Sequence, residues 1–378
     1  MLIEIHMIQN HSPSNLNRDD LGAPKTCYFG GVMRSRISSQ CLKRSIRTSE
    51  QFKLLCGGIR TRQLARLISE RVAGKADVKK RATKILEKCG IAPKDESRSD
   101  MLVYTTKEAI GRIAQLLQDD DGESDELAEK CGKLISDLVA VPDMAMSGRM
   151  LETGVLTETT VDAALQVAHA ISTHEARPEV DYYVAADDIP GNDAGAGYID
   201  EAMFASACFY KYFSIHWETL LKNLQGFDGN KEHLAAHTVG AFLRGAALTS
   251  PTGKQNSFAA HNPPDGIIIE LKKDRGTPVS YANAFADPVP SMGPRDIVSE
   301  AIARLGQYAH DLDVGYGKPS THMRLWFSPN LAKKLFFIED GKTLPVADRE
   351  IGSLDQLTAE LVKGIGYDWD AVQQVTIK

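Results

Sequence analysis

The stretch from Ser12 to Arg47 reads SPSNLNRDDLGAPKTCYFGGVMRSRISSQCLKRSIR and is the most informative part of the sequence. The whole chain has a net charge of −6, but here Asp19 and Asp20 face a larger basic set: Arg18, Lys25, Arg34, Arg36, Lys43, Arg44 and Arg47. A local positive field on an acidic protein indicates a site for a polyanion. The Asn, Ser and Gln side chains between the charges can hydrogen-bond phosphate and ribose.

The same stretch predicts a capped helix after a tight backbone turn. Gly30-Gly31 breaks the chain and permits a close approach of the backbone. Ser38 and Ser39 can cap a helix that runs roughly over Gln40–Ser49. The N-terminus of that helix offers N–H groups that favour phosphate.

Three basic side chains lie on this predicted helix. Lys43 and Arg47 are four residues apart and therefore share a face, with Arg44 beside them. The alternative is a solvated basic helix, because a charge run without further context is weak evidence for binding.

Length and composition describe an ordinary globular protein. The chain has 378 residues, of which 43% are hydrophobic and 25% charged, so it can form two or three domains or one domain with a large insertion. The chain contains no run of 18 apolar residues, so the sequence predicts no transmembrane helix. The N-terminus, MLIEIHMIQNHS, predicts a strand rather than a signal peptide. The 6 cysteines are scattered without a CxxC pair, which is typical of a reducing cytoplasm.

The first half of the chain predicts one strand, one long loop and a helical block. The strand covers Leu2–Gln9, and the polar loop Asn10–Gly31 is long enough to carry function. Helical periodicity then extends from about Gln51 to Ala140, and we interpret this block as an insertion in a mixed fold. Its predicted amphipathic helices are Gln63–Val72, Val78–Lys88, Lys107–Gln118 and Asp125–Val139.

The second half predicts a mixture of strands and helices. Asp181–Ala186 predicts one side of an arm with a glycine-rich tip at Pro190–Gly197. The remaining predicted elements are a helix at Val155–Ser172, an aromatic strand at Phe204–His216, a helix at His233–Ala247, a strand at Gly266–Leu271, a helix at Arg295–His310 and a strand at His322–Phe327. Without the insertion, the order of strands and helices is that of a ferredoxin-like or RRM-like α+β fold.

Signatures of catalysis are nearly absent from the sequence. No GxGxxG follows a strand, and neither HExxH nor GxSxG occurs. The Gly-Lys pair in Thr252–Gln255 lacks the upstream glycine and the hydroxyl residue of a phosphate-binding loop. The adjacent carboxylates Asp19-Asp20 and Asp187-Asp188 point in different directions, which makes an acid–base dyad a poor interpretation. We therefore expect no catalytic residue, no metal and no cofactor.

Three further places suit contact with nucleic acid. Met150, next to Arg149, can wedge against a base, although a position in the core is an equal alternative. Tyr182-Tyr183 can stack on bases or pack within the protein. The polar segment Thr249–Asn262 suits backbone contact to RNA, or is a surface loop.

Several motifs in this chain match one known family. SPSNLNRDD, the FGG break, RxRISSQxLKR, AMSGRM, AHAISTHE, DDIPG and KQNSFAAHNPPD follow one another between about Ile5 and Phe285. In these motifs the chain resembles the CasC-type backbone subunit of the type I-E CRISPR Cascade complex, a member of the RAMP superfamily. The region after Pro290 matches only loosely.

The resemblance implies a hand-shaped protein. An RRM-like palm would take residues 1–50 and 207–378, a helical fingers insertion 51–175, and a β-hairpin thumb 176–206. Similar proteins stack head-to-tail along a CRISPR guide RNA in the cytoplasm, where the thumb displaces one nucleotide at a regular interval. The other guide bases stay free to pair with a target DNA strand. The implied partners are the guide, that DNA strand, further copies of the chain and other Cascade subunits, with no membrane and no cofactor.

The resemblance also assigns residues. Met150 falls where the family wedges an apolar side chain beside the displaced base, and Tyr183 and Val184 fall at thumb positions that pack against it. Relatives carry Phe-Thr there, so Val184 lacks a hydroxyl. The full set of implied RNA-binding residues is Arg18, Ser38, Ser39, Gln40, Lys43, Arg44, Arg47, Arg149, Met150, Tyr183, Val184, Lys254, Gln255 and Asn256.

Two other functions remain as alternatives. A metal-dependent endoribonuclease of the same superfamily would use a loop aspartate, from the set Asp19, Asp20, Asp187 and Asp188. A metabolic α/β enzyme would turn over a small molecule and would purify without RNA.

Overall fold

The computed structural model describes residues 1–73, 77–95, 98–151, 153, 156, 160–185, 198–273, 276–290, 295–317, 321–375 and 377. The chain forms two compact units. The sheet unit contains Met1–Gln51, Val167–Ser214 and Gly240–Asp368, and the helical unit contains Phe52–Gln166, Ile215–Val239 and Trp369–Lys378.

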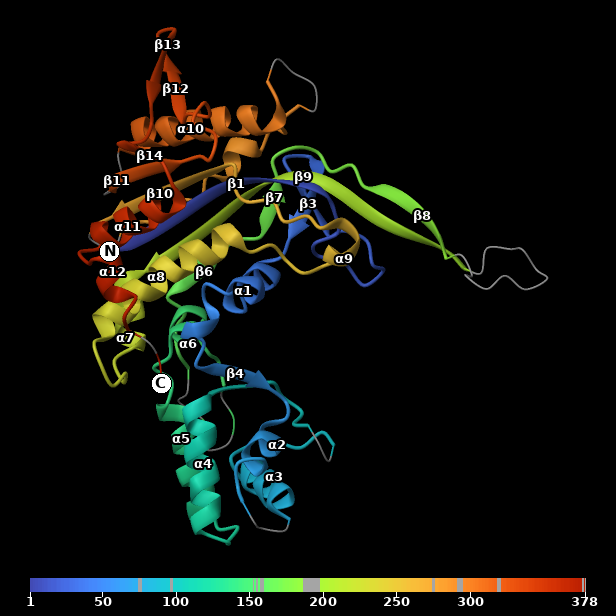
Figure 1. Cartoon of the computed structure of the whole chain (residues 1–378), viewed down its shortest axis with the longest axis vertical. Helices are drawn as coiled ribbons and strands as arrows, with labels where there is room; N and C mark the ends of the chain where they lie inside the picture. Colours follow the sequence, from blue (N-terminus) through green and yellow to red (C-terminus); the bar gives the residue numbers. More distant parts are fainter. Residues whose placement is uncertain are drawn as a thin grey trace, which may run out of the picture. The chain divides into compact units, whose positions relative to one another are not determined.

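A large mixed sheet is the centre of the sheet unit (Figure 1). Its strand order is β14-β11-β10-β1-β9-β7-β3-β2, with β6 and β8 also paired to β9. The strands are β1 (Leu2–Ser14), β2 (Thr26–Phe29), β3 (Val32–Ile37), β6 (Leu165–Val167), β7 (Ala170–Ser172), β8 (Glu179–Ala185), β9 (Tyr198–His216), β10 (Gly266–Lys272), β11 (Thr321–Phe327) and β14 (Arg349–Ile351).

Strand β1 lies between β10 and β9, so both of its edges are paired, and consecutive residues on both of its faces are buried. It pairs antiparallel with β10, from Leu2 opposite Lys272 to Ile8 opposite Gly266. The apolar residues predicted for this strand, Leu2, Ile3, Ile5, Met7 and Ile8, are all 0% exposed. β1 thus anchors the sheet, and the loop that follows it starts from a fixed position.

Helices and a hairpin complete the sheet unit. They are α1 (Ser39–Arg47), α9 (Gln255–Phe258), η2 (Ala282–Phe285), α10 (Ile297–Tyr316), α11 (Leu354–Gly364) and the hairpin of β12 (Phe336–Glu339) and β13 (Lys342–Pro345). The apolar side of α10 packs on the sheet, where Ile302 and Leu305 share a buried cluster with Ile8 and Trp326. Helix α8 (Lys231–Leu248) crosses the boundary between the units.

The helical unit has its own apolar core, to which Ile68, Ile85, Ile113 and Ile135 contribute. Its elements are η1 (Lys53–Leu55), β4 (Gly58–Thr61), α2 (Leu64–Ser69), α3 (Val78–Lys88), β5 (Val103–Thr106), α4 (Lys107–Asp119), α5 (Asp125–Asp137), α6 (Pro142–Ser147), α7 (Trp217–Asn223) and α12 (Trp369–Val372). The predicted helices of the insertion are therefore confirmed as α2 to α5. No helix in the described ranges is long and apolar enough to cross a membrane.

Two predictions of secondary structure are wrong. The described residues of Val155–Ser172 form no helix but irregular chain followed by β6 and β7. Here the backbone joins the sheet, since the N–H of Ala168 bonds to the carbonyl of Tyr212, and this pairing overrides local helical propensity. The predicted loop Asn10–Gly31 also contains the end of β1 and all of β2, because sheet pairing tolerates polar residues on strands that approach an edge.

Candidate nucleic-acid interface

Helix α1 begins at a capping serine, as the sequence predicts. The Ser38 hydroxyl accepts the backbone N–H of Cys41 at 3.3 Å. The side-chain oxygen of Asn17 in turn accepts the N–H of Ser38 at 2.8 Å. The cap therefore ties the start of α1 to the loop that follows β1, and Ser39 and Gln40 form the first turn of the helix.

The basic residues of α1 lie away from its buried face. Leu42, Ser45 and Ile46 are buried, and the helical period places Lys43, Arg44 and Arg47 off this face. Arg44 is exposed, and Lys43 and Arg47 are half-buried. Helix α1 therefore carries one exposed and two half-buried basic side chains.

A groove with a cavity volume of about 900 Å³ opens beside α1. Three segments line it, all within the sheet unit: residues 16–20 with Gly22, the outer side of α1, and residues 249–253 without Pro251. The second segment consists of Cys41, Arg44 and Ser45 of α1 and of Thr48 and Ser49, which follow the end of the helix. Arg18 and Arg44 thus meet in one groove, whereas Lys43 and Arg47 are not among its lining residues.

Asp19 shapes the first wall of this groove. Its carboxylate accepts the backbone N–H groups of Leu21 and Ala23, each at 2.9 Å, and its own N–H bonds to the carbonyl of Ala23. An aspartate that bonds to nearby backbone amides in this way stabilises a turn. Asp20 is exposed and also lines the groove.

The third wall turns sharply at Lys254, whose φ of 48° lies in the left-handed region. Gln255 then folds back, and its side-chain N–H donates to the carbonyl of Pro251 at 2.9 Å. Lys254 and Gln255 are half-buried and Asn256 is exposed. These three residues follow the groove-lining segment along the chain without lining the groove themselves.

Arg34 belongs to the fold rather than to the predicted positive field. It is 0% exposed, and its guanidinium donates to the carbonyls of Phe29 at 3.1 Å and Phe285 at 2.8 Å, among others. A Cβ atom on Gly30 would lie 1.7 Å from the carbonyl oxygen of Ala286, so the Gly30-Gly31 break permits the close approach that the sequence predicts. The structural role of Arg34 could not be predicted from the sequence, because a buried arginine has no distinctive local sequence pattern.

Strands β8 and β9 form the predicted arm. Figure 1 shows this hairpin extending beyond the rest of the sheet, with Glu179 opposite Phe204 and Ala185 opposite Tyr198. Tyr183 is 41% exposed and donates its hydroxyl to Asp200 at 2.9 Å. Val184 is 57% exposed. The predicted tip, Pro190–Gly197, and the aspartates Asp187 and Asp188 lie outside the described residues.

In the helical unit, the structure separates the two residues of the predicted wedge. Met150 is 83% exposed, whereas Arg149 is 5% exposed. The Arg149 guanidinium donates to the backbone carbonyls of Ile135 and Ser136 at 2.6 and 3.2 Å. Its donors are thus directed into the unit, in contrast to the RNA contact that the resemblance implies for it.

Sequence reasoning named the segment Thr249–Asn262 as a whole but did not single out the hydroxyl residues that line the groove. Ser45 on α1, Thr48 just after it, and Thr249 and Thr252 on the third wall belong to this lining. The signal was present in part: Cys41, Ser45 and Ser49 recur every four residues, as expected for one side of a helix. Attention to the charged residues alone did not reveal it.

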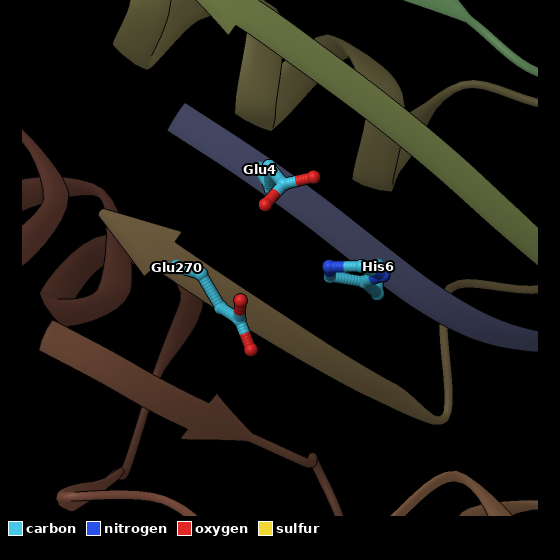
Figure 2. A group of neighbouring side chains, drawn as sticks. All are labelled: Glu4, His6 and Glu270. Atoms are coloured by element: carbon cyan, nitrogen blue, oxygen red, sulfur yellow. The ribbon is translucent and has the colours of Figure 1, made fainter. Parts of the chain in front are cut away.

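A second polar cluster lies inside the sheet unit (Figure 2). Glu4 and His6 on β1 and Glu270 on β10 are all 0% exposed, and one ligand atom from each lies within 4.8 Å of the others. His6 Nδ1 is 2.8 Å from the Tyr210 hydroxyl, while His6 Nε2 has no hydrogen-bond partner. Burial lowers the pKa of His6 to about 3, so the imidazole is neutral.

The charges around this cluster favour a structural role over a metal site. Lys272, which is 1% exposed, forms an ion pair with Glu4 and lies 3.9 Å from Glu270 Oε2. Arg324 Nε donates to Glu270 Oε1 at 2.6 Å. Both carboxylates therefore already face a buried cation, and a divalent ion would have to displace an ammonium group from between them.

The sequence matches the family model for CT1975-like proteins over residues 3–354. The chain belongs to the CT1975-like protein family. Among curated proteins, no sequence match reaches significance.

Two solved structures are similar to this CT1975-like protein over nearly its whole length. A chain of a "CRISPR RNA-guided surveillance complex, pre-nicking" superposes with a TM-score of 0.82 at 28% identity, covering 96% of this chain and 100% of that one. A chain of a "CRISPR RNA-guided surveillance complex" gives a TM-score of 0.61 at 26% identity, covering 97% and 100%. The resemblance to a Cascade backbone subunit that the motifs predict is thereby confirmed.

Proposed function

We propose that this CT1975-like protein is a non-catalytic, RNA-binding backbone subunit of a CRISPR surveillance complex. One observation carries the proposal: a groove of about 900 Å³ brings Arg18 and Arg44 together between hydroxyl side chains. Guanidinium groups bind phosphate, and hydroxyls can bond to phosphate and ribose. Such a groove holds a strand by its backbone and reads no base sequence. The similarity to chains of RNA-guided complexes supports a guide RNA as that strand.

The sheet suits the palm of such a subunit. Within the strand order, β10-β1-β9-β7 places β1 and β9 at the centre, which supports the RRM-like palm expected from the order of the elements. The β8–β9 hairpin supports the thumb. Its exposed apolar residues Val180, Tyr182 and Val184 alternate along β8 and therefore share one face. We assign this face to the guide and to the next copy in a head-to-tail stack.

Head-to-tail contacts are heterologous, so the stack needs an external limit to its length. The guide RNA and capping partner subunits supply this limit, and the guide bases between the displaced positions pair with target DNA. Each copy adds a few phosphate contacts, which makes binding multivalent and sensitive to salt. We place the assembly in the cytoplasm, without a cofactor.

The test is copurification. The chain is purified with its companion subunits in the presence of a repeat-derived transcript, and the bound nucleic acid is sequenced. The proposal expects guide RNA bound by several copies of the chain. Protein that is free of nucleic acid and remains monomeric with that transcript and its companions contradicts it.

The second candidate is a metal-dependent endoribonuclease, and one observation favours it. Asp20 is exposed in the groove, where a carboxylate could bind a metal ion next to a phosphate. Asp19 is less suited, because its carboxylate already accepts backbone amides. Incubation of the assembled complex with magnesium and labelled RNA distinguishes the nuclease from the non-catalytic subunit. Cleavage that disappears in Asp20→Ala would replace the first proposal with this one.

A further inference from the structure

The motif Ser147-Gly148-Arg149-Met150 lies in the helical unit and is tied to a neighbouring segment. The backbone N–H of Arg149 donates to the Val161 carbonyl at 2.9 Å, and the N–H of Val161 donates to the Arg149 carbonyl at 2.7 Å. Gly148 has a φ of 72°, and a Cβ atom there would lie 2.8 Å from the carbonyl oxygen of Val161. Glycine is therefore required for the two segments to approach.

The side chain of Arg149 closes the end of a helix. Ile135 and Ser136, whose carbonyls accept its guanidinium N–H groups, belong to the last turn of α5. Carbonyls in the last turn lack partners within the helix and carry the negative end of its dipole. Burial lowers the pKa of Arg149 to about 10, so the side chain stays cationic at neutral pH. A buried guanidinium thus satisfies two carbonyls at once.

These contacts fix the direction of Met150. Its neighbours on both sides are buried, since Arg149 is 5% and Leu151 is 6% exposed, whereas Met150 itself is 83% exposed. Successive side chains of an extended segment alternate in direction. With Arg149 held at α5 and Leu151 held in the core, the side chain between them has to point outward.

We propose that Arg149 is a positioning residue that presents Met150 to the RNA, through its bonds to the end of α5 and to Val161. This inference rests on the proposed function and on the position that the resemblance implies for Met150, beside a displaced guide base. It differs from a phosphate contact by Arg149, because this residue is only 5% exposed and its guanidinium points to backbone carbonyls inside the unit. Substitution of Arg149 should therefore change base displacement and leave the electrostatic part of RNA binding intact.

The experiment uses the complex assembled on guides that carry 2-aminopurine at successive positions. This base fluoresces more strongly when it leaves the stack, so the wild-type complex reports the displaced positions. Met150→Ala removes the wedge directly and sets the reference for its loss. Arg149→Gln should lose the fluorescence increase to the same extent, and Arg149→Lys should retain part of it, because lysine keeps the charge without the planar fork. The double variant Arg149→Gln/Met150→Ala should lose no more than either single variant.

Salt dependence separates the two roles of Arg149. The slope of log K against log salt is negative, and loss of one phosphate contact lowers its magnitude by about 0.7 for a single strand. Arg149→Gln should leave this slope unchanged, and Arg44→Gln, the matched control in the groove, should lower it while keeping the fluorescence pattern. Thermal unfolding of the free protein checks that each variant folds. If Arg149→Gln does not fold, Arg149→Lys and Gly148→Ala, which disturbs the same segment, are compared.

Two results would overturn the inference. The first is a lowered salt slope with intact base displacement in a folded Arg149 variant, which would make Arg149 a phosphate ligand. The second is an unchanged fluorescence pattern in a folded Arg149 variant while Met150→Ala loses it. A wild-type complex that binds no RNA is a different result, because it contradicts the proposed function itself.

Discussion

Gly253 lies so close to Leu16 that a Cβ atom on Gly253 would come within 2.4 Å of the Leu16 carbonyl oxygen. The two residues belong to different walls of the groove beside α1. The close approach of the two backbones sets the width of the groove. A Cβ added at Gly253 would meet a backbone carbonyl, which cannot move aside as a flexible side chain would.

Gly253→Ala should therefore open the groove and weaken RNA binding. We expect the affinity for RNA to fall and the free energy of unfolding to decrease by about 1–3 kcal/mol through overpacking, with the protein still folded. Mobility-shift titration measures the affinity, and thermal unfolding measures the fold. Gly352→Ala is the matched control, because the nearest atom to its Cβ is Gln356 Oε1 at 3.6 Å. Equal affinity of the two variants would show that the groove width does not matter.

Local patterns in the sequence predicted much of the fold. The boundaries of α3 match the predicted Val78–Lys88, because an amphipathic period and the surrounding polar residues mark this helix without reference to the rest of the protein. The cap at Ser38 was predictable for the same reason, since it depends on residues within one turn.

Long-range contacts explain the failures. The sequence predicts Arg34 and Arg149 as surface cations, but both are buried and bonded to backbone carbonyls, of Phe285 for Arg34 and of Ile135 for Arg149. A basic residue in a sequence gives no sign of whether a carbonyl or a phosphate accepts its hydrogen bonds. The helix predicted for the segment that forms β6 and β7 is wrong for a similar reason, because the pairing partner of these strands, β9, follows later in the chain.

The buried pair of Glu4 and Lys272 supplies a stability prediction. Lys272→Met leaves the carboxylate of Glu4 without its buried cation, and we expect a loss of about 3–5 kcal/mol in the free energy of unfolding. Glu4→Gln/Lys272→Met removes both charges and should recover a large part of that loss. Denaturant unfolding of the three proteins is the measurement. A double variant as unstable as the single one would show that the loss comes from packing rather than charge.

The buried histidines predict acid sensitivity. Burial lowers the pKa of His6 and of His11 to about 3, against about 6.5 in an unfolded chain. Below pH 6.5 the unfolded chain takes up protons that the folded chain refuses. The free energy of unfolding should therefore fall by about 1.4 kcal/mol per pH unit for each histidine as the pH drops from about 6.5 toward 3.

Denaturant unfolding at several pH values, in wild type and in His6→Gln, checks this sign. Burial raises the pKa of Glu4, which favours the folded state on acidification and opposes the effect of the histidines. The test is therefore the difference in pH dependence between wild type and His6→Gln, not the slope of either protein alone. The variant should lose stability more slowly on acidification. Parallel curves for both proteins would show that His6 accepts a proton in the folded state.

The predicted thumb tip gives a test of assembly. Deletion of residues 190–197 should leave the free protein folded, because this glycine-rich segment has little apolar surface to bury. It should abolish regular stacking along the guide, which size-exclusion chromatography and electron microscopy of the assembled complex can measure. A deletion variant with a lowered unfolding temperature but normal stacking would place the segment in the core of the protein.

The central claim is that a cationic groove beside α1 holds a ribose–phosphate strand. Its most direct test is a salt-dependent mobility-shift titration of an Arg18→Glu, Arg44→Glu variant with a repeat-derived guide, because these two arginines line the groove. The control reverses two exposed lysines of the sheet unit outside the groove, Lys342 and Lys363. We predict that the first variant loses guide binding, and that the control, with the same net charge, binds like wild type. Undiminished binding by the first variant at moderate salt would show that the groove is an ordinary solvated surface.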